Sequence, residues 1–144
     1  MAARFLLVDA HSVIFSWPEL SKLHRRRMLL AREELVKILT EYQDTTGVRV
    51  VAVFDGQGGK TAEASEPGGI QIFYSGQGQT ADNVIERLTA TYGKKFELTV
   101  VTNDLAEQDT AASFGAVSVS TDRLREMLEE ARADFQRTLK RHRR

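Results

Sequence analysis

Five short apolar runs, spread along the whole chain, constrain the fold more than any other feature of the sequence. Runs of this kind are typical of strands that are covered on both faces, as in a parallel sheet. Segments with helical periodicity lie between most of them and predict helices over residues 19–43, 80–93, 105–115 and 121–140. This order predicts an α/β fold of three layers with a central, mainly parallel sheet. The runs are RFLLVD (4–9), VRVVAVFD (48–55), IQIFY (70–74), LTVVTND (98–104) and AVSVS (116–120).

The length and composition narrow the class of protein. A chain of 144 residues fits one domain over residues 1–144. The absence of cysteine excludes disulfides, thiolate catalysis and zinc–thiolate sites. The apolar start is too short for the core of a signal peptide, and no stretch approaches the roughly 20 apolar residues of a membrane span. We therefore expect a cytoplasmic protein with no membrane partner, whose oligomeric state the sequence does not indicate.

The formal net charge is zero, yet the basic side chains are unevenly distributed. KLHRRRMLLAR (22–32) and the tail RTLKRHRR (137–144) contain no acidic residue. Such segments are either solvated helix faces or contacts to a polyanion. The candidate contacts are Arg25, Arg26, Arg27, Lys140 and Arg141.

Three of the expected strands end at an aspartate: Asp9, Asp55 and Asp104. In an open parallel sheet, ligands bind at the carboxyl ends of the strands, so these side chains are expected to share one rim. Asp82 falls in the first turn of an expected helix for which Thr80 is the N-cap, and it points toward the same rim.

Carboxylates gathered in this way repel one another, and each raises the pKa of its neighbours. A bound divalent cation offsets the repulsion. Oxygen ligands without cysteine or a histidine cluster favour Mg²⁺ (or Mn²⁺), which is the usual partner of phosphate substrates. The sequence therefore predicts a cation site that serves phosphodiester hydrolysis.

Each acid also has a purely structural interpretation. Asp104 and Glu107 match a capping box, in which the two side chains satisfy backbone N–H groups at a helix start. Asp82 is stabilised by the helix dipole without any metal. Asp55 precedes Gly56 and fits a turn.

Two glycine-rich stretches suggest further structure. GQGGKTAEASEPGG (56–69) predicts a surface loop between the second and third strands. GQGQTA (76–81) fits the Gly-x-Gly-x-x-Ala shape of a dinucleotide-binding turn, which makes a nucleotide-binding protein an alternative. Asp82 disfavours that alternative, because it would place negative charge beside the pyrophosphate.

Several motifs run in order from about residue 5 to 130: LLVDAHSVI, VVAVFDG, QTADNVIERL, VVTNDLAEQ and FGAVSVSTDRL. Together they resemble the YacP-like NYN-domain proteins, which are PIN-like nucleases and include a bacterial ribosome-associated endoribonuclease. The resemblance implies a PIN-like (NYN) α/β/α fold and Mg²⁺- or Mn²⁺-dependent cleavage of RNA. By motif it implies catalytic and metal-binding roles for Asp9, Asp82 and Asp104. It implies supporting roles for Asp55, Ser12, Asn103 and Glu107. It also makes RNA the polyanion that the two basic segments are expected to contact.

Two departures from the family pattern separate the functional hypotheses. The family's D-G-Y-N motif reads Asp9-Ala10-His11-Ser12 here, and the acid expected before T-A-D is Gln79. The favoured hypothesis is a metal-dependent endoribonuclease that hydrolyses RNA phosphodiester bonds, with ribosome-associated mRNA as one setting. The alternative is an RNA- or ribosome-binding protein with reduced or lost catalysis.

Overall fold

The computed structural model describes residues 3–56, 62–63, 69–76 and 78–142 of the chain. Their central sheet has the strand order β3-β4-β2-β1-β5-β6. β1 lies in the middle and pairs in parallel with β2 and β5, while β4 and β6 extend the parallel sheet outward. All five apolar runs therefore form parallel strands, as the sequence predicts. The strands are β1 (Arg4–Asp9), β2 (Arg49–Phe54), β3 (Ala62–Glu63), β4 (Gln71–Tyr74), β5 (Glu97–Val101) and β6 (Val117–Val119).

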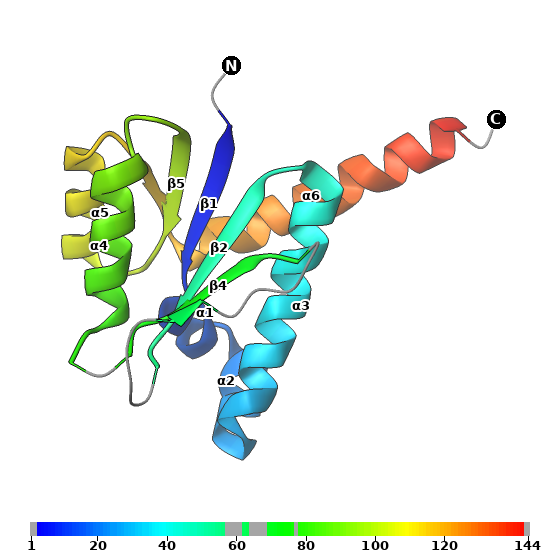
Figure 1. Ribbon diagram of the computed structural model, residues 1–144. Helices are drawn as coiled ribbons and strands as arrows, with labels where there is room; N and C mark the ends of the chain where they lie inside the picture. Colours follow the sequence, from blue (N-terminus) through cyan, green and yellow to red (C-terminus); the bar gives the residue numbers. More distant parts are fainter. Residues whose placement is uncertain (1–2, 57–61, 64–68, 77, 143–144) are drawn as a thin grey trace.

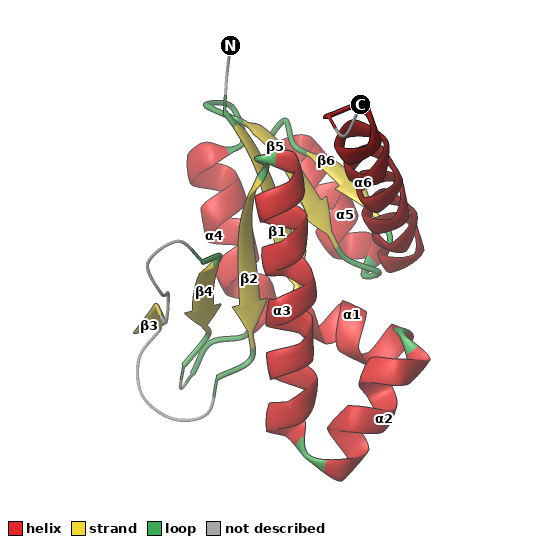
Figure 2. Ribbon diagram, turned by 90° about the vertical axis from the view of Figure 1, so that its right-hand side faces the viewer, coloured by secondary structure: helices red, strands yellow, loops and turns green. Residues whose placement is uncertain are grey.

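Helices cover both faces of the sheet and complete the three-layer α/β/α fold (Figures 1 and 2). α1, α2, α3 and α6 lie over one face, and α4 and α5 lie over the other. The described helices are α1 (Ala10–Ser16), α2 (Pro18–Arg26), α3 (Met28–Thr46), α4 (Ala81–Tyr92), α5 (Leu105–Ser113) and α6 (Thr121–His142).

The central strand shows why its sequence is apolar throughout. Leu6 and Val8 point into the core beneath α1, α2, α3 and α6. Leu7 points the other way, into the core beneath α4 and α5. Alternate side chains of one strand enter different cores, so neither face tolerates polar residues until the strand ends at Asp9.

The chain between β1 and β2 differs from the sequence expectation in two ways. α1 begins directly after Asp9, where no helix was expected. The single helix expected over 19–43 is two helices that meet at Arg27, whose backbone is extended at φ −158° and ψ 123°. The break lets α2 fold back on α3, so that Leu20 and Leu35 are buried in the same core. No glycine or proline lies at the break.

Glycine marks the expected ends of α4 and α5, for two different reasons. Gly115 follows α5 in the left-handed region at φ 88°. Gly93 has helical dihedrals, but a Cβ there would lie 2.6 Å from the carbonyl oxygens of Thr89 and Phe114. Gly93 is therefore required by the close approach of two backbones and not by its own conformation.

The stretch 56–69, expected to be a loop, lies largely outside the described residues. Within it, Ala62–Glu63 form β3, which pairs antiparallel with β4. This pairing adds the one antiparallel strand of the described sheet.

The last turns of α6 extend beyond the body of the domain (Figure 1). Phe135 and Leu139 on this part of the helix are about half exposed. Of the predicted basic tail, residues 137–142 belong to α6 and residues 143–144 are not described. No helix in the described ranges combines the length and apolarity needed to cross a membrane.

Replacing Leu35 by alanine should lower the free energy of unfolding by about 2–5 kcal/mol, because the side chain is fully buried between α3 and the sheet. Leu29→Ala in the same helix is the matched control, since Leu29 is 57% exposed and its loss should cost no more than about 0.5 kcal/mol. Urea denaturation of both variants measures the difference. Equal losses would contradict the assignment of Leu35 to the core.

Candidate metal centre

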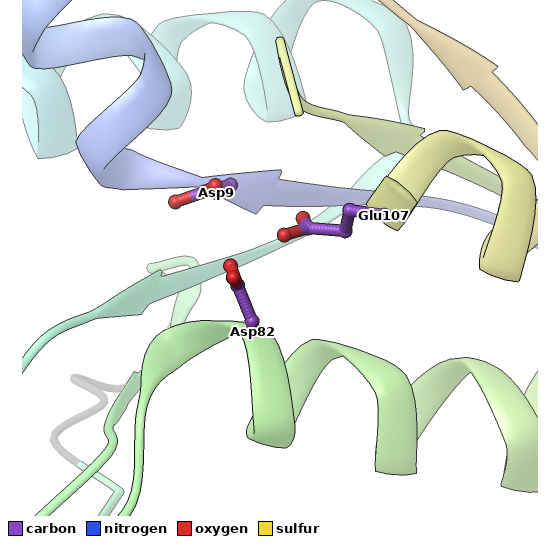
Figure 3. Close-up of side chains that lie close together, drawn as sticks. All are labelled: Asp9, Asp82 and Glu107. Carbon is purple, nitrogen blue, oxygen red and sulfur yellow. The ribbon is translucent and has the colours of Figure 1, made fainter. Parts of the chain in front are cut away.

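Three carboxylates converge at the carboxyl end of the sheet: Asp9, Asp82 and Glu107. Each offers one oxygen, and the three oxygens lie within 4.8 Å of one another. Figure 3 shows the side chains approaching a common point from the end of β1, the start of α4 and the start of α5. The residues are far apart in sequence, and the parallel topology brings them together.

Asp9 is held rigidly at the end of β1. It is 5% exposed, and the hydroxyl of Ser12 donates a 3.0 Å hydrogen bond to its Oδ2. The hydroxyl of Thr102 lies 3.4 Å from the same oxygen as a second donor. The other oxygen, Oδ1, is buried and has no hydrogen-bond partner in the described part of the chain.

Asp55 supports the site by positioning α4. Its Oδ1 accepts a 2.8 Å hydrogen bond from the backbone N–H of Ala81, the first residue of that helix. Its Oδ2 lies 2.6 Å from His11 Nε2. Thr80 caps the helix by accepting from the backbone N–H of Asn83. Asp82, in the first turn, is thus fixed relative to β2.

Asp104 and Glu107 form only half of the predicted capping box. Asp104 Oδ1 accepts from the backbone N–H groups of Ala106 and Glu107 at 2.9 and 3.3 Å. In a complete box, Glu107 would accept from the Asp104 N–H. That N–H donates instead to the hydroxyl of Thr102 at 3.1 Å. Glu107 is consequently free to point at Asp9.

Asn103 ties this end of the sheet to α6. Its side-chain Nδ2 donates to the Thr121 hydroxyl at 2.9 Å, and its Oδ1 accepts from the Thr121 backbone N–H at 3.0 Å. Its own backbone N–H donates to Ser12 Oγ at 3.2 Å. Asn103 therefore organises the residues around Asp9 without facing the three carboxylates itself.

The surroundings make ionisation of the two buried acids unfavourable. Burial raises the pKa of Asp9, the hydrogen bond from Ser12 opposes this, and the nearby charge of Asp82 adds to it. Burial, then the neighbouring carboxyl of Asp82 and the charge of Asp9, together raise the pKa of Glu107 to about 9. Neither oxygen of Glu107 has a hydrogen-bond partner among the described residues.

These observations fit a divalent cation held by Asp9, Asp82 and Glu107. The donors are all oxygens, as Mg²⁺ and Mn²⁺ prefer. Three buried oxygens, one on Asp9 and two on Glu107, lack any other partner in the described chain. A positive charge at this point would satisfy them and remove the repulsion that raises both pKa values.

The structure places the predicted residues differently around this point. Asp9 and Asp82 lie in the group of three, and Glu107, expected as a supporting residue, completes it. Asp104 lies beside the group, where it lines a hollow of about 200 Å³ together with Asp82 and Glu107. Thr102 was missed by the sequence analysis, although it immediately precedes the Asn103-Asp104 pair at the end of a strand.

The predicted RNA contacts separate into two places. Arg25, Arg26 and Arg27 lie where α2 ends and α3 begins, at a tip that extends beyond the carboxyl ends of the strands (Figures 1 and 2). Lys140 and Arg141 lie at the far end of α6, near the opposite end of the sheet. The site and the arginines of α2 thus share one end of the molecule, and the tail does not.

Comparisons of the sequence and of the structure with known proteins lead to the same group of proteins. Residues 6–144 match the family model described as the YacP-like NYN domain. The YacP protein of Bacillus subtilis is 33% identical over 127 residues, which cover 87% of this chain and 73% of the relative.

Two solved structures of Rae1 (YacP) from Bacillus subtilis share the fold. A tryptophan-to-leucine mutant of Rae1 superposes with a TM-score of 0.79 at 28% identity, over 95% of this chain and 81% of that one. A second Rae1 structure gives a TM-score of 0.75 at 29% identity, over 95% and 80% of the two chains.

Without metal, the free energy of unfolding should fall as the pH rises from about 4.5 toward about 9. Glu107 has a pKa of about 9 in the folded protein and 4.5 as its ordinary value, so in this window the unfolded chain binds fewer protons than the folded one. Glu107→Gln cannot titrate, so its free energy of unfolding should not fall across this window, and the difference in its favour over the wild type should widen toward about pH 9.

Urea denaturation in EDTA across this pH range measures the effect. Mg²⁺ should stabilise the wild type at the upper end of the range more than it stabilises Glu107→Gln, because binding to the folded state alone raises stability. Parallel pH profiles for the two proteins would contradict the placement of Glu107.

Proposed function

The chain belongs to the YacP-like NYN domain family, which has a PIN-like nuclease fold, and from this premise we propose that it is a metal-dependent endoribonuclease. The observation that carries the proposal is the convergence of Asp9, Asp82 and Glu107 with buried oxygens that have no other described partner. The substrate is RNA, with mRNA on ribosomes in the cytoplasm as the proposed setting.

The chemistry divides between the cation and the protein. When bound, Mg²⁺ or Mn²⁺ supplies charge stabilisation for the phosphodiester and lowers the pKa of a bound water. The protein holds its ligands still: Ser12 and Thr102 fix one oxygen of Asp9, which leaves the other directed away from those donors. Asp55 does the same for the helix that carries Asp82.

Asp104 is proposed as a further acid of the reaction. Only its Oδ1 accepts the two cap hydrogen bonds at the start of α5. The side chain is exposed and lines the hollow beside Asp82 and Glu107. A carboxylate in this position is suited to orient a water molecule or to accept a proton from it.

The departures at Ser12 and Gln79 affect the site unequally. Ser12 replaces the amide of the family motif, yet its hydroxyl reaches Asp9 at 3.0 Å and so still supports this ligand. Gln79 accepts a 2.9 Å hydrogen bond from Arg87, where the family motif has an acid. The loss of that carboxylate favours weaker cation binding, and it is the basis for the alternative of an RNA- or ribosome-binding protein with reduced catalysis.

RNA approaches a site of this kind through its phosphates. Arg25, Arg26 and Arg27 are exposed at the end of α2, on the same end of the molecule as the carboxylates. We assign them to phosphate contacts with RNA at the site. Lys140 and Arg141 lie too far along α6 to share that segment of RNA, and we assign them to contacts elsewhere on RNA or on a ribosome.

Cleavage of a labelled single-stranded RNA should require Mn²⁺ or Mg²⁺ and should stop in EDTA. Asp9→Asn should lower the rate by more than about 100-fold, because loss of a direct ligand exceeds the roughly 10- to 100-fold effect of losing an outer hydrogen bond. Ser12→Ala should lower the rate by that smaller factor. Ser12→Asn, which restores the amide of the family motif, should be more active than Ser12→Ala. RNA binding without cleavage, unchanged by Asp9→Asn, would support the binding-only alternative.

The roles of Glu107 and Asp104 can be separated with matched amide variants. Glu107→Gln should raise the Mn²⁺ concentration needed for half-maximal activity, since a ligand is lost. Asp104→Asn should lower the rate at saturating Mn²⁺ and leave that concentration within about twofold of the wild-type value. If Asp104→Asn raises the Mn²⁺ requirement and Glu107→Gln lowers only the rate, then Asp104 is the metal ligand and Glu107 is the further acid.

A further inference from the structure

Three aromatic rings meet on the outer side of α1 and α2, next to the carboxylates but apart from them. His11 and Phe15 are stacked, with ring centroids 5.0 Å apart and an angle of 8° between the planes. His24 of α2 meets Phe15 edge-on, at 4.8 Å between centroids. We call His11, Phe15 and His24 the aromatic cluster.

Two rings of the aromatic cluster, Phe15 and His11, are open to solvent, and His24 is half-buried. Phe15 is 53% exposed, and the side chain of His11 is 43% exposed. Phe15 forms no part of either hydrophobic core of the described chain. The Phe15 ring is therefore available to stack on a planar partner, and the contact with His11 holds its orientation.

The cluster is tied to the proposed metal centre at two points. α1 starts immediately after Asp9, so Phe15 lies about 9 Å farther along the chain at the rise of a helix. His11 contacts Asp55, and the other oxygen of Asp55 holds the N–H of Ala81, next to Asp82. A nucleotide on the cluster would therefore place its phosphate chain close to the carboxylates.

The charge around the cluster suits a polyanion. Lys22, Arg25, Arg26 and Arg27 are exposed on the same helical hairpin, and none forms an ion pair with another described residue. The one acid of α2, Glu19, is paired with Arg125 of α6. The acid that contacts the cluster, Asp55, is likewise paired, with His11, so the four basic side chains remain available to a polyanion.

We propose that the aromatic cluster is a nucleobase-stacking subsite, which binds one unpaired base of a single-stranded RNA while the arginines of α2 contact its phosphates. The inference rests on the proposed function in taking RNA as the ligand, but it does not depend on cleavage. Aromatic rings beside basic side chains are the usual means of binding single strands, since every base presents a flat face. Stacking of this kind tolerates different bases, so the subsite positions RNA and does not read its sequence.

A double-mutant cycle tests the subsite: a change in the protein is combined with a change in the RNA, and the Kd of each pair is measured. All proteins carry Asp9→Asn to prevent cleavage, and the probe is a single-stranded RNA of about 12 nucleotides, within the usual range of site sizes. A matched set of probes lacks one base at a time and keeps the sugar–phosphate chain. Phe15→Leu removes the ring and keeps an apolar side chain, Phe15→Tyr keeps the ring, and Phe135→Leu removes an equally exposed ring on α6 as a control.

Phe15→Leu should raise the Kd for the intact RNA by about 5- to 100-fold, the loss expected for one stacked base. Phe15→Tyr and Phe135→Leu should bind as the parent does. One base-lacking RNA should bind the parent as weakly as the intact RNA binds Phe15→Leu, and combining the two changes should cause no further loss. Matching melting temperatures of the variants establish that the fold is kept.

Two results would overturn the proposal. One is unchanged RNA affinity in Phe15→Leu. The other is that the loss of affinity from Phe15→Leu multiplies with the loss from removing a base, whichever base is removed. Unchanged RNA affinity together with lost binding to ribosomes would identify a protein-binding surface instead. If Phe15 is coupled to one base, but the protein with Asp9 intact does not cleave RNA, the stacking subsite is supported and the proposed function is refuted. If the protein with Asp9 intact cleaves RNA, but Phe15 is coupled to no base, the proposed function is supported and the stacking subsite is refuted.

Discussion

The mutual repulsion of three carboxylates is the constraint on which the rest of this structure depends. Asp9 and Glu107 are buried beside Asp82, and burial together with like charge raises the pKa of both buried acids. Such a group is unfavourable unless a proton or a cation compensates it. The fold holds it together because each acid comes from an element anchored elsewhere: a central strand and the starts of two helices packed on the sheet.

Thr102 connects much of this arrangement through a single hydroxyl. It lies within reach of Asp9 as a donor and accepts the N–H of Asp104. By taking that N–H it opens the capping box of α5, and Glu107 is released from a local role to face the other acids. Thr102, which in sequence looks like the end of a strand, thus determines whether Glu107 caps its own helix or faces Asp9 and Asp82. Its full burial keeps water from competing for these bonds.

The same end of the sheet gathers the features that suit a single-stranded polyanion. α1 leaves Asp9 directly and carries His11 and Phe15 at its surface, while α2 adds exposed arginines beside them. This combination arises from the break at Arg27, which folds α2 back against α3. The described part of the basic tail, residues 137–142 of α6, lies at the other end of the molecule.

The sequence by itself determined the parallel α/β sheet, because strands buried on both faces must be apolar throughout. It also determined that Asp9 and Asp82 would meet, because the carboxyl ends of parallel strands and the starts of their following helices lie at one rim. Only the tertiary structure decided between Asp104 and Glu107, since a capping box looks the same in sequence whether or not a distant threonine intercepts one of its hydrogen bonds. Tertiary structure likewise decided the break at Arg27 and the stacking of His11 on Phe15. These depend on packing between segments, and local sequence carries no signal for them.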